Sequence, residues 1–422
     1  MVAVAAQLPA FEAALAQINH CNKCGFCLPA CPTYQLTGNE VDSPRGRIAM
    51  VEGVLNGEIS AAKGLEDSLS YCLGCRACET ACPSEVQYHR VLEAGRQVLD
   101  RARPGHRGLT FLPRTLLRLT RHPKRLNRLA RLGRRAASWP IPESLKALTP
   151  MLRYQSEQVV PAPHGAAEDA AAFFDGCVQE ALFGDANQAA RELLRASGYD
   201  VVSPAGQTCC GALAWHAGRA EEAKRLAQAN IAAFEMLGDA AVVNTAGGCG
   251  AFLSEYGEIF ADDRLWADRA DRFSQRVQDW TRALEDAPRR LTFKGDGERV
   301  VLQNSCHLLN VEGGGDAPAR LARLAAGDTF LPVPGQDRCC GSAGIYNIQH
   351  PDWAVRLLDR KMGEVVSQEP DRVLVVNPGC QMQMTLGVHR EGSHATVEHL
   401  ARYLYRAFRR AQGEAQSADQ ID

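Results

Sequence analysis

Two runs of cysteines with identical spacing are the residues of this chain most clearly suited to chemistry. In each run, three cysteines are separated by two residues, and a fourth follows three residues later, directly before a proline. The two sets are Cys21, Cys24, Cys27, Cys31-Pro32 and Cys72, Cys75, Cys78, Cys82-Pro83. Thiolates at this spacing are typical ligands of [4Fe-4S] clusters, because closely spaced cysteines can reach different irons of one small cube. The sequence therefore predicts one-electron redox chemistry at two clusters.

The fourth cysteine of each run is expected to bind the other run's cluster, as in two-cluster bacterial ferredoxins. The predicted ligands of cluster 1 are Cys21, Cys24, Cys27 and Cys82, and those of cluster 2 are Cys72, Cys75, Cys78 and Cys31. Two alternatives are zinc sites and disulfides. Zinc sites usually group their cysteines as two separated pairs, which does not fit three equally spaced cysteines followed by Cys-Pro.

The other eight cysteines form an internal repeat in the second half of the chain. The first copy has Cys177, Cys209-Cys210-Gly211 and Cys249; the second has Cys306, Cys339-Cys340-Gly341 and Cys380. The corresponding cysteines are 129 to 131 residues apart. A spacing that is nearly constant over eight cysteines indicates a duplicated domain.

Each copy shows the pattern of a parallel α/β domain. An apolar strand leads to the first cysteine, and a helix and a second strand lead to the Cys-Cys-Gly loop. Another helix and a third strand then lead to the last cysteine. Loops at the carboxyl ends of parallel strands meet at one edge of the sheet, so the four cysteines of a copy should converge there. Gly211 and Gly341 would allow the tight turn that adjacent cysteine ligands need. His307, directly after Cys306, is a candidate for contact with a bound group.

These patterns predict an α+β region followed by α/β domains. Residues 1–100 form a helical, ferredoxin-like domain for two [4Fe-4S] clusters, and residues 101–168 form a basic helical connector and linker. Residues 169–290 and 291–422 form the two copies of the parallel cysteine-rich domain.

The composition of the chain restricts its partners and its location in the cell. The 422 residues include 47 Lys and Arg against 49 Asp and Glu, so overall charge does not indicate binding to nucleic acid. Cysteines in cluster-ligand patterns fit a reducing cytoplasm. The N-terminus lacks the basic region of a secretory signal, and we find no apolar run of about 18 residues that could cross a bilayer. We expect a cytoplasmic protein, either free or peripheral on the inner face of the cell membrane.

The connector is strongly basic. Between Arg90 and Arg135 there are fourteen Lys or Arg and only two acidic residues, and leucines recur there at spacings of three, four and seven. This pattern indicates amphipathic helices. Residues 101–135 could contact an anionic membrane surface or an acidic partner, or their leucines could pack on the core of the chain itself.

The chain resembles the iron–sulfur subunits of bacterial glycolate oxidase, also called glycolate dehydrogenase. The resemblance is carried by residues 27–40 (CLPACPTYQLTGNE), by residues 43–48 (SPRGRI) and by both Cys-Cys-Gly repeats, with Cys306-His307-Leu308 and residues 341–344 (GSAG) in the second. It implies a subunit that takes electrons from FAD-containing partner subunits, which oxidise glycolate to glyoxylate, and passes them to a quinone or another acceptor. We find no nucleotide-binding or hydrolase motif, so we expect no catalytic residues here and no activity on glycolate by this chain alone.

The repeats also resemble the cysteine-rich domains of heterodisulfide reductase B-type subunits, which implies cluster binding at the Cys-Cys-Gly loops. In that family each motif ends in two cysteines separated by two residues, but here the last position is Phe252 or Gln383. Four cysteines per copy are compatible with one further iron–sulfur cluster or metal in one or both repeats. A redox-active cysteine pair or a repeat without a bound group remains open.

Three functions are compatible with these features. The first is the glycolate dehydrogenase subunit, and the second is the equivalent subunit of a lactate or sn-glycerol-3-phosphate dehydrogenase. The third is a thiol/disulfide enzyme in which the C-terminal cysteines are themselves catalytic.

Overall fold

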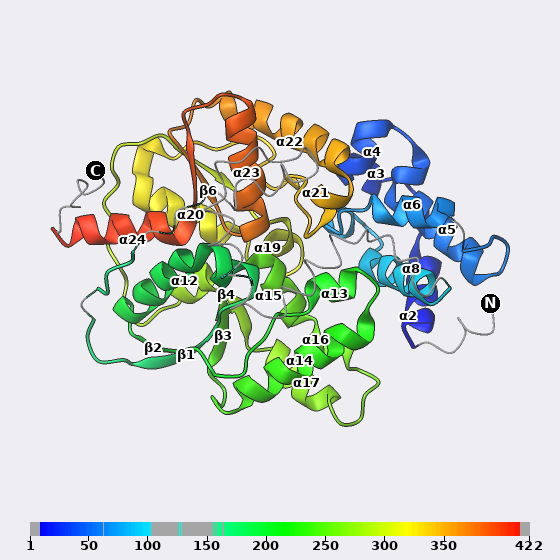
Figure 1. Cartoon of the computed structure of the whole chain (residues 1–422), viewed down its shortest axis with the longest axis horizontal. Coiled ribbons are helices and arrows are strands. Elements are labelled where there is room, and N and C mark those ends of the chain that lie inside the picture. Colours follow the sequence, from blue (N-terminus) through cyan, green and yellow to red (C-terminus); the bar gives the residue numbers. More distant parts are fainter. Residues whose placement is uncertain are drawn as a thin grey trace.

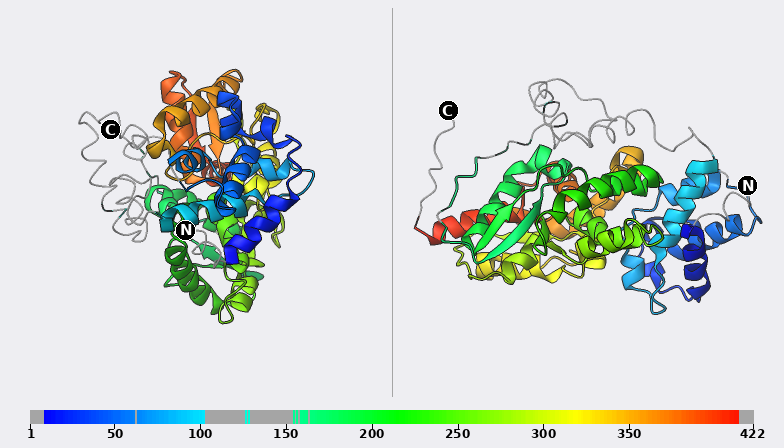
Figure 2. Two further views of the ribbon diagram at one scale, coloured as in Figure 1. Left: turned by 90° about the vertical axis from the view of Figure 1, so that its right-hand side faces the viewer. Right: turned by 90° about the horizontal axis from the view of Figure 1, so that it is seen from below.

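The computed structural model describes residues 9–61, 63–102, 126, 128, 154, 156, 158–162 and 164–413. Within these residues, a helical N-terminal region lies at one end of an elongated molecule, and two α/β repeats form the rest (Figures 1 and 2). The predicted sequence of a ferredoxin-like region followed by parallel α/β domains is confirmed.

The described residues of the N-terminal region form helices that are joined by loops, with no strand among them. Its elements are α2 (Pro9–His20), α3 (Cys27–Ala30), α4 (Pro32–Thr37), the 3₁₀ helix η1 (Glu40–Asp42), α5 (Pro44–Leu55), α6 (Lys63–Ser70), α7 (Ala77–Thr80) and α8 (Tyr88–Ala102). Helix α5 starts where the sequence provides a cap: Ser43 Oγ accepts a hydrogen bond from Gly46 N at 3.0 Å, and Pro44 occupies the first turn. Apolar residues of α5, α6 and α8, including Val51, Leu69 and Val91, form the core that holds the cysteine loops.

Repeat 1 contains a parallel four-stranded sheet with the strand order β2-β1-β3-β4. Its elements are β1 (Asp169–Phe174), α12 (Val178–Ala196), β2 (Tyr199–Val202), α13 (Ala212–His216), α14 (Ala220–Glu235), β3 (Ala241–Asn244), α15 (Gly247–Ser254), α16 (Tyr256–Ile259), α17 (Ala267–Ser274), β4 (Val277–Asp279) and α18 (Trp280–Glu285). Strand β4 was not predicted, because its three residues have no apolar run.

Repeat 2 contains a parallel three-stranded sheet with the order β5-β6-β7. Its elements are β5 (Val300–Gln303), α19 (Cys306–Asn310), α20 (Asp316–Ala326), the 3₁₀ helix η3 (Gly327–Thr329), α21 (Tyr346–Gln349), α22 (Pro351–Val366), β6 (Arg372–Val375), α23 (Pro378–Arg390), β7 (Thr396–His399) and α24 (Leu400–Ala411). The second strand predicted for this copy is wrong. Only an isolated bridge joins Val300 to Phe330, since Pro332 and Pro334 follow and cannot donate to a strand ladder.

The two repeats share one core through helices α18 and α24, which each contact both copies. Helix α24 of repeat 2 packs on α12 of repeat 1, and α18 of repeat 1 packs on α20 of repeat 2. The largest apolar cluster accordingly mixes buried residues of both copies, such as Phe173 and Trp280 with Leu302 and Leu404. The repeats are therefore joined by a continuous apolar core.

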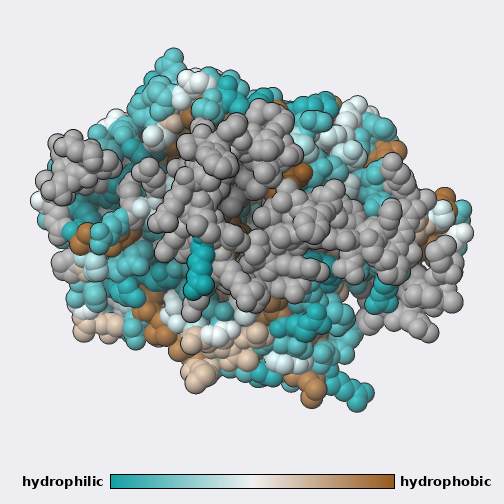
Figure 3. Space-filling model, in the orientation of Figure 1, coloured by the Kyte–Doolittle hydropathy of each residue, from teal (hydrophilic) through white to brown (hydrophobic). Residues whose placement is uncertain are grey.

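Most of the basic connector lies outside the described residues, so the proposed membrane or partner contact of residues 101–135 stays a prediction. One of its leucines is described: Leu126 is buried against Leu182 and Phe183 of α12. Among the described helices, none is both long and apolar enough to span a bilayer. The described part of the face in Figure 3 is mainly hydrophilic.

Candidate metal centres

The two ferredoxin-like cysteine runs surround two neighbouring cavities. Cys21, Cys24, Cys27 and Cys82 line a cavity of about 30 Å³, and Cys31, Cys72, Cys75 and Cys78 line another of about 20 Å³. Cys78 contributes to both. The structure thus brings the fourth cysteine of each run to the three cysteines of the other run. That arrangement is the one that crossed ligation of two clusters would use.

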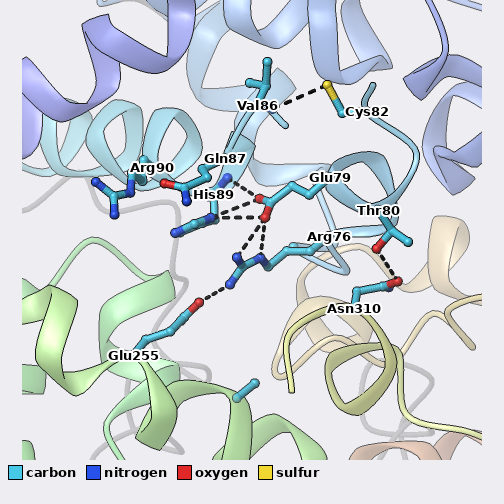
Figure 4. A network of polar contacts seen from close by, with 12 residues as sticks. Arg76, Glu79, Thr80, Cys82, Val86, Gln87, His89, Arg90, Glu255 and Asn310 are labelled. Atoms are coloured by element: carbon cyan, nitrogen blue, oxygen red, sulfur yellow. Dashed lines mark hydrogen bonds and ion pairs between the residues drawn. The ribbon is translucent and has the colours of Figure 1, made fainter. Parts of the chain in front are cut away.

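Several polar groups lie within hydrogen-bonding distance of the cysteine sulfurs. Gly74 N is 3.5 Å from Cys72 Sγ, Val86 N is 3.4 Å from Cys82 Sγ (Figure 4), and Tyr88 Oη is 3.6 Å from Cys72 Sγ. Donors to a ligating sulfur stabilise its negative charge and raise the reduction potential of a cluster.

Arg47 supports a cluster at the second cavity. Its side chain is 1 % exposed and lines this cavity. Its Nε donates to Ser68 O at 2.8 Å and its Nη1 to Thr33 Oγ1 at 3.1 Å, whereas Nη2 has no acceptor among the described residues. A buried cation with a spare donor beside four thiols fits an anionic iron–sulfur cluster. Arg47 is therefore a buried charge, although it lies near the start of α5.

Arg45 has a different environment. It is partly exposed, forms an ion pair with Glu40 at 2.5 Å and donates to Lys23 O at 3.0 Å. Its guanidinium therefore fixes the loop between Cys21 and Cys24.

All eight cysteines of the repeats line one cavity of about 300 Å³ between the two copies. Within repeat 1, Cys177 Sγ and Cys209 Sγ are 3.3 Å apart. Cys72 of the N-terminal region lines the same cavity. The sequence predicted convergence within each copy, but it did not predict that both sets would face a common space.

The lining of this cavity fits a bound redox group. Gln179 and Ser342, both nearly fully buried, have side-chain polar atoms without a partner among the described residues. Buried polar atoms usually have partners, so these two indicate a missing one. No three or more His, Cys, Asp or Glu in the described chain are placed as around a single metal ion. Cluster ligands are spaced more widely, because each thiolate binds a different iron.

The positions that replace a fifth cysteine are packed or hydrogen-bonded. Phe252 is buried in the core of repeat 1. Gln383 is also buried; its Oε1 accepts from Asn347 Nδ2 at 3.2 Å, and its Nε2 donates to Ala354 O at 3.3 Å. Neither residue supplies a sulfur, so each repeat has four candidate cysteine ligands.

Neighbouring cysteines and burial raise the pKa of several thiols in both repeats, among them Cys210, Cys339 and Cys380. In repeat 1, neighbouring Cys209 and burial raise the pKa of Cys177. In repeat 2, by contrast, the pKa of Cys340 is lowered by neighbouring Cys339 and Cys380, by the Ser342 backbone and by the charge of Lys361.

Gly211 and Gly341 occupy the backbone conformation that was predicted for them. Their φ angles are +96° and +88°, in the left-handed region that favours glycine. A Cβ on Gly341 would lie 2.8 Å from Ala354 O. The glycines thus let each cysteine pair turn closely over the following helix, and they contribute no side chain to a bound group.

Replacing Gly341 with alanine should therefore destabilise repeat 2 by roughly 1–3 kcal/mol, the usual cost of a strained backbone position. Urea unfolding of the full-length protein measures this loss. Gly363→Ala is the matched control, because its Cβ would meet no atom within 4 Å. Equal stability of the two variants would contradict the prediction.

His307 connects repeat 2 to the loop of the second cysteine run. Its Nε2 lies 3.0 Å from Gly74 O, and since a carbonyl only accepts, Nε2 must carry the hydrogen. Burial lowers the pKa of His307 to about 4. Nearby, Asn310 Nδ2 donates to Cys75 O at 2.9 Å. Helix α19, which begins at Cys306, therefore holds the backbone of the Cys72–Cys75 loop.

The same interface contains an apolar cluster that joins the candidate ligands of two sites. Cys75 from the N-terminal region packs in it with Cys339, Tyr346 and Leu357 of repeat 2, and Cys306 lies at its edge. The described cysteines of repeat 1 belong to a different cluster. The second cysteine run is thus in direct contact with repeat 2.

A network of charged residues joins the N-terminal region to repeat 1 (Figure 4). Arg76 pairs with Glu79 at 2.8 Å and also with Glu255. His89 lies 3.1 Å from Glu79 and 3.4 Å from Glu258. These contacts hold α7 and the first turn of α8 against the start of α16, so both repeats contact the cysteine-run region.

Comparisons with known proteins agree with these features. The family model described as a 4Fe-4S dicluster domain matches residues 17–86, and that of a cysteine-rich domain matches residues 171–254 and again 300–385. The chain is 32 % identical to "Lactate utilization protein A" of Oceanobacillus iheyensis over 235 residues, which cover 55 % of this chain and 94 % of that protein.

Two longer matches cover most of the chain. It is 38 % identical to the "Probable glycolate oxidase iron-sulfur subunit" of Bacillus subtilis over 417 residues, or 93 % of this chain and 94 % of the relative. It is 34 % identical to the "Glycolate oxidase iron-sulfur subunit" of Escherichia coli over 369 residues, or 86 % and 89 %. The resemblance seen in the sequence is thereby confirmed: the chain belongs to the family of glycolate oxidase iron–sulfur subunits.

Proposed function

We propose that this protein is the electron-transferring iron–sulfur subunit of an oxidoreductase complex that oxidises glycolate to glyoxylate. The observation that carries the proposal is the contact of Cys75 with Cys306 and Cys339 in one apolar cluster. This contact brings candidate ligands of two sites next to one another, which supports electron transfer between them. The full-length similarity to glycolate oxidase iron–sulfur subunits supplies the substrate class.

Electrons enter at cluster 1 in this proposal. Its ligands would be Cys21, Cys24, Cys27 and Cys82, of which Cys24 is exposed. The neighbouring Phe26 is 64 % exposed, which suits a surface that a partner covers. An FAD-containing subunit docks there, because the oxidation of a hydroxy acid needs a flavin or nicotinamide, and we find no motif for either cofactor in this chain.

From cluster 1 the electrons pass to cluster 2, held by Cys31, Cys72, Cys75 and Cys78, and then to the cavity between the repeats. Bound iron–sulfur clusters would supply reversible one-electron chemistry at these sites. The protein's own residues fix the separation: His307 and Asn310 hold the loop that carries Cys72 and Cys75. The final acceptor is a quinone or another acceptor, and the isolated chain is not catalytic on glycolate.

Substrate-dependent reduction of the assembled complex tests this proposal. The complex is purified anaerobically, mixed with glycolate or with D- or L-lactate, and frozen for EPR. Glycolate should produce the signals of reduced clusters. If lactate reduces the clusters and glycolate does not, the lactate alternative suggested by the lactate utilization relatives replaces the proposal.

A thiol/disulfide enzyme is the other candidate, since the Cys-Cys pairs line an accessible cavity. Iron analysis distinguishes it from cluster binding in the repeats. If Cys209→Ser and Cys339→Ser abolish disulfide reduction and leave about eight irons per chain, the cysteines are catalytic thiols. If the same substitutions remove iron beyond the two cubanes, they are cluster ligands.

A peripheral membrane contact through residues 101–135 is part of the same proposal, because electrons that reach a quinone must reach the bilayer. Reversing the charge of Arg118, Arg125 and Arg128 is expected to weaken binding to anionic vesicles. Vesicle sedimentation at low and high salt measures the change, and the wild-type binding should itself decrease with salt. Unchanged sedimentation of the variant would favour leucines that pack on the chain's own core.

A further inference from the structure

The Cys-Cys-Gly loops of the two repeats lie on equivalent helices, α14 and α22. Pro351 and Val366, the ends of α22, each lie 131 positions after the ends of α14, Ala220 and Glu235. A Cβ on Gly211 would meet the backbone of Ala223, and a Cβ on Gly341 would meet that of Ala354, which is also 131 positions later. The same offset makes Lys361 the structural equivalent of Asn230.

Asn230 supports the cysteine loop of repeat 1 without charge. Its side chain is fully buried; Nδ2 donates to Cys209 O at 3.1 Å, and Oδ1 accepts from Thr208 N at 2.7 Å. A neutral amide is thus sufficient to hold this loop.

Lys361 supports the corresponding loop of repeat 2 but also brings an ammonium group into the protein. Its side chain is 2 % exposed, and Nζ donates to Gly335 O in the loop before Cys339. The repeats therefore share the hydrogen-bonding role of this position and differ in its charge.

The charge of Lys361 acts on the candidate ligands of repeat 2. Lys361 lines, together with Cys75, Cys306 and Cys339, a cavity of about 340 Å³ between the N-terminal region and repeat 2. Burial lowers the pKa of Lys361, and the negative charges of Cys340 and Glu364 oppose this effect. Two carboxylates, Asp337 and Glu364, line the same cavity, and Glu364 pairs with Arg338 at 2.5 Å.

We propose that Lys361 raises the reduction potential of the group held by Cys306, Cys339, Cys340 and Cys380 above that of the group in repeat 1, so that repeat 2 accepts each electron first. This inference rests on the proposed electron-transfer function. In the step concerned, cluster 2 is oxidised by one electron and the group in repeat 2 is reduced by one, with no bond made or broken. A nearby positive charge stabilises the reduced form, because that form carries one more negative charge.

The test is an EPR-monitored redox titration of the full-length protein after anaerobic purification. The signal of repeat 2 is identified by its loss in Cys339→Ser. Lys361→Gln keeps a donor for Gly335 O and removes the charge; Lys361→Met removes both. Both should lower the equilibrium constant for electron transfer from cluster 2 to repeat 2 by about tenfold or more, equivalent to about 59 mV for a one-electron couple.

Two variants serve as controls. Lys361→Arg keeps the charge and should leave the potential near its wild-type value. Arg356→Met removes an exposed cation of the same helix that does not line this cavity, and should also leave the potential unchanged. The shift in the Lys361 variants should be larger for the signal of repeat 2 than for either cubane.

Three results would overturn the proposal. One is an unchanged potential of repeat 2 in Lys361→Gln with full iron content. Another is loss of iron from repeat 2 in both uncharged variants but not in Lys361→Arg, which would make Lys361 necessary for holding the group. The third is a spectrum that Cys339→Ser does not change, since repeat 2 would then hold no redox group. Reduction of the cubanes by glycolate is measured separately, so a failure of this inference is distinguishable from a failure of the proposed glycolate oxidation.

Discussion

Replacing Cys31 with serine is expected to remove cluster 2 and to leave cluster 1 in place, although Cys31 follows the cluster 1 cysteines in the sequence. The reason is geometric: Cys31 lines the cavity of Cys72, Cys75 and Cys78, whereas Cys82 lines that of Cys21, Cys24 and Cys27. A serine ligand binds iron less well than a thiolate, so the cluster should be lost or strongly weakened. Each lost cubane removes about four irons and four sulfides per chain.

Double variants distinguish crossed ligation from ligation within each run. Cys31→Ser combined with Cys75→Ser should lose no more iron than either single variant, because both residues belong to cluster 2. Cys31→Ser combined with Cys24→Ser should lose both cubanes, about eight irons. If the two double variants give the opposite results, the clusters are not crossed. Iron and sulfide analysis, together with EPR of the reduced protein, provides the measurement.

Replacing His89 with glutamine should weaken the packing of the N-terminal region on repeat 1 in a pH-dependent way. Burial opposes protonation of His89, but hydrogen bonds to Glu258 and Glu79 raise its pKa to about 10. A histidine whose pKa is raised on folding stabilises the protein fully below its unfolded pKa of about 6.5. This contribution is lost as the pH rises from about 6.5 to 10.

The expected loss of stability in His89→Gln is about 2–4 kcal/mol at pH 7 and less than about 1 kcal/mol at pH 10. Urea midpoints of wild type and variant at several pH values measure it. His394→Gln is the control, because His394 is exposed and its pairing with Asp371 should contribute little. A difference between wild type and His89→Gln that does not change between pH 7 and pH 10 would contradict the prediction.

Acid should weaken the same network by protonating its carboxylates. The pKa of Glu79 is lowered, against the effect of burial, by its hydrogen bond and ion pair with His89, and that of Glu258 is lowered similarly. A carboxyl group whose pKa is lowered on folding stabilises the protein above its unfolded pKa of about 4.3. This stabilisation is lost as the pH falls further. The ion pairs of this interface are therefore most stable between about pH 5 and 7.

Much of the fold could be predicted because its signals repeat along the chain. The constant spacing of eight cysteines indicated the duplication, and the apolar runs before Cys177 and Cys306 indicated parallel strands at whose ends the cysteines meet. Both predictions depend on local patterns. Strands β4 and β7 lacked such a pattern: Val277–Asp279 has one apolar residue, and Thr396–His399 is largely polar.

The candidate site was less predictable, because it depends on how distant segments pack. The sequence shows two sets of four cysteines, but their common cavity follows from the way that the repeats face each other. Arg47 and Lys361 resembled ordinary surface charges, since no motif distinguishes a lysine or arginine that will be buried beside sulfur. The signal that could have identified Lys361 was the repeat itself, in which a lysine is aligned with Asn230.

The reciprocal packing of α18 and α24 on the other repeat has the form of a symmetric homodimer whose subunits have been joined into one chain. A protein with a single repeat would expose the surface that the partner's helix covers, and pairing about a two-fold axis would bury it in both copies at once. In such a homodimer, every substitution appears twice. Covalent fusion removes that constraint, so position 361 can carry a charge while its counterpart, position 230, remains neutral. In this way, two equivalent sites of an ancestral homodimer could become two sites that electrons reach in a fixed order.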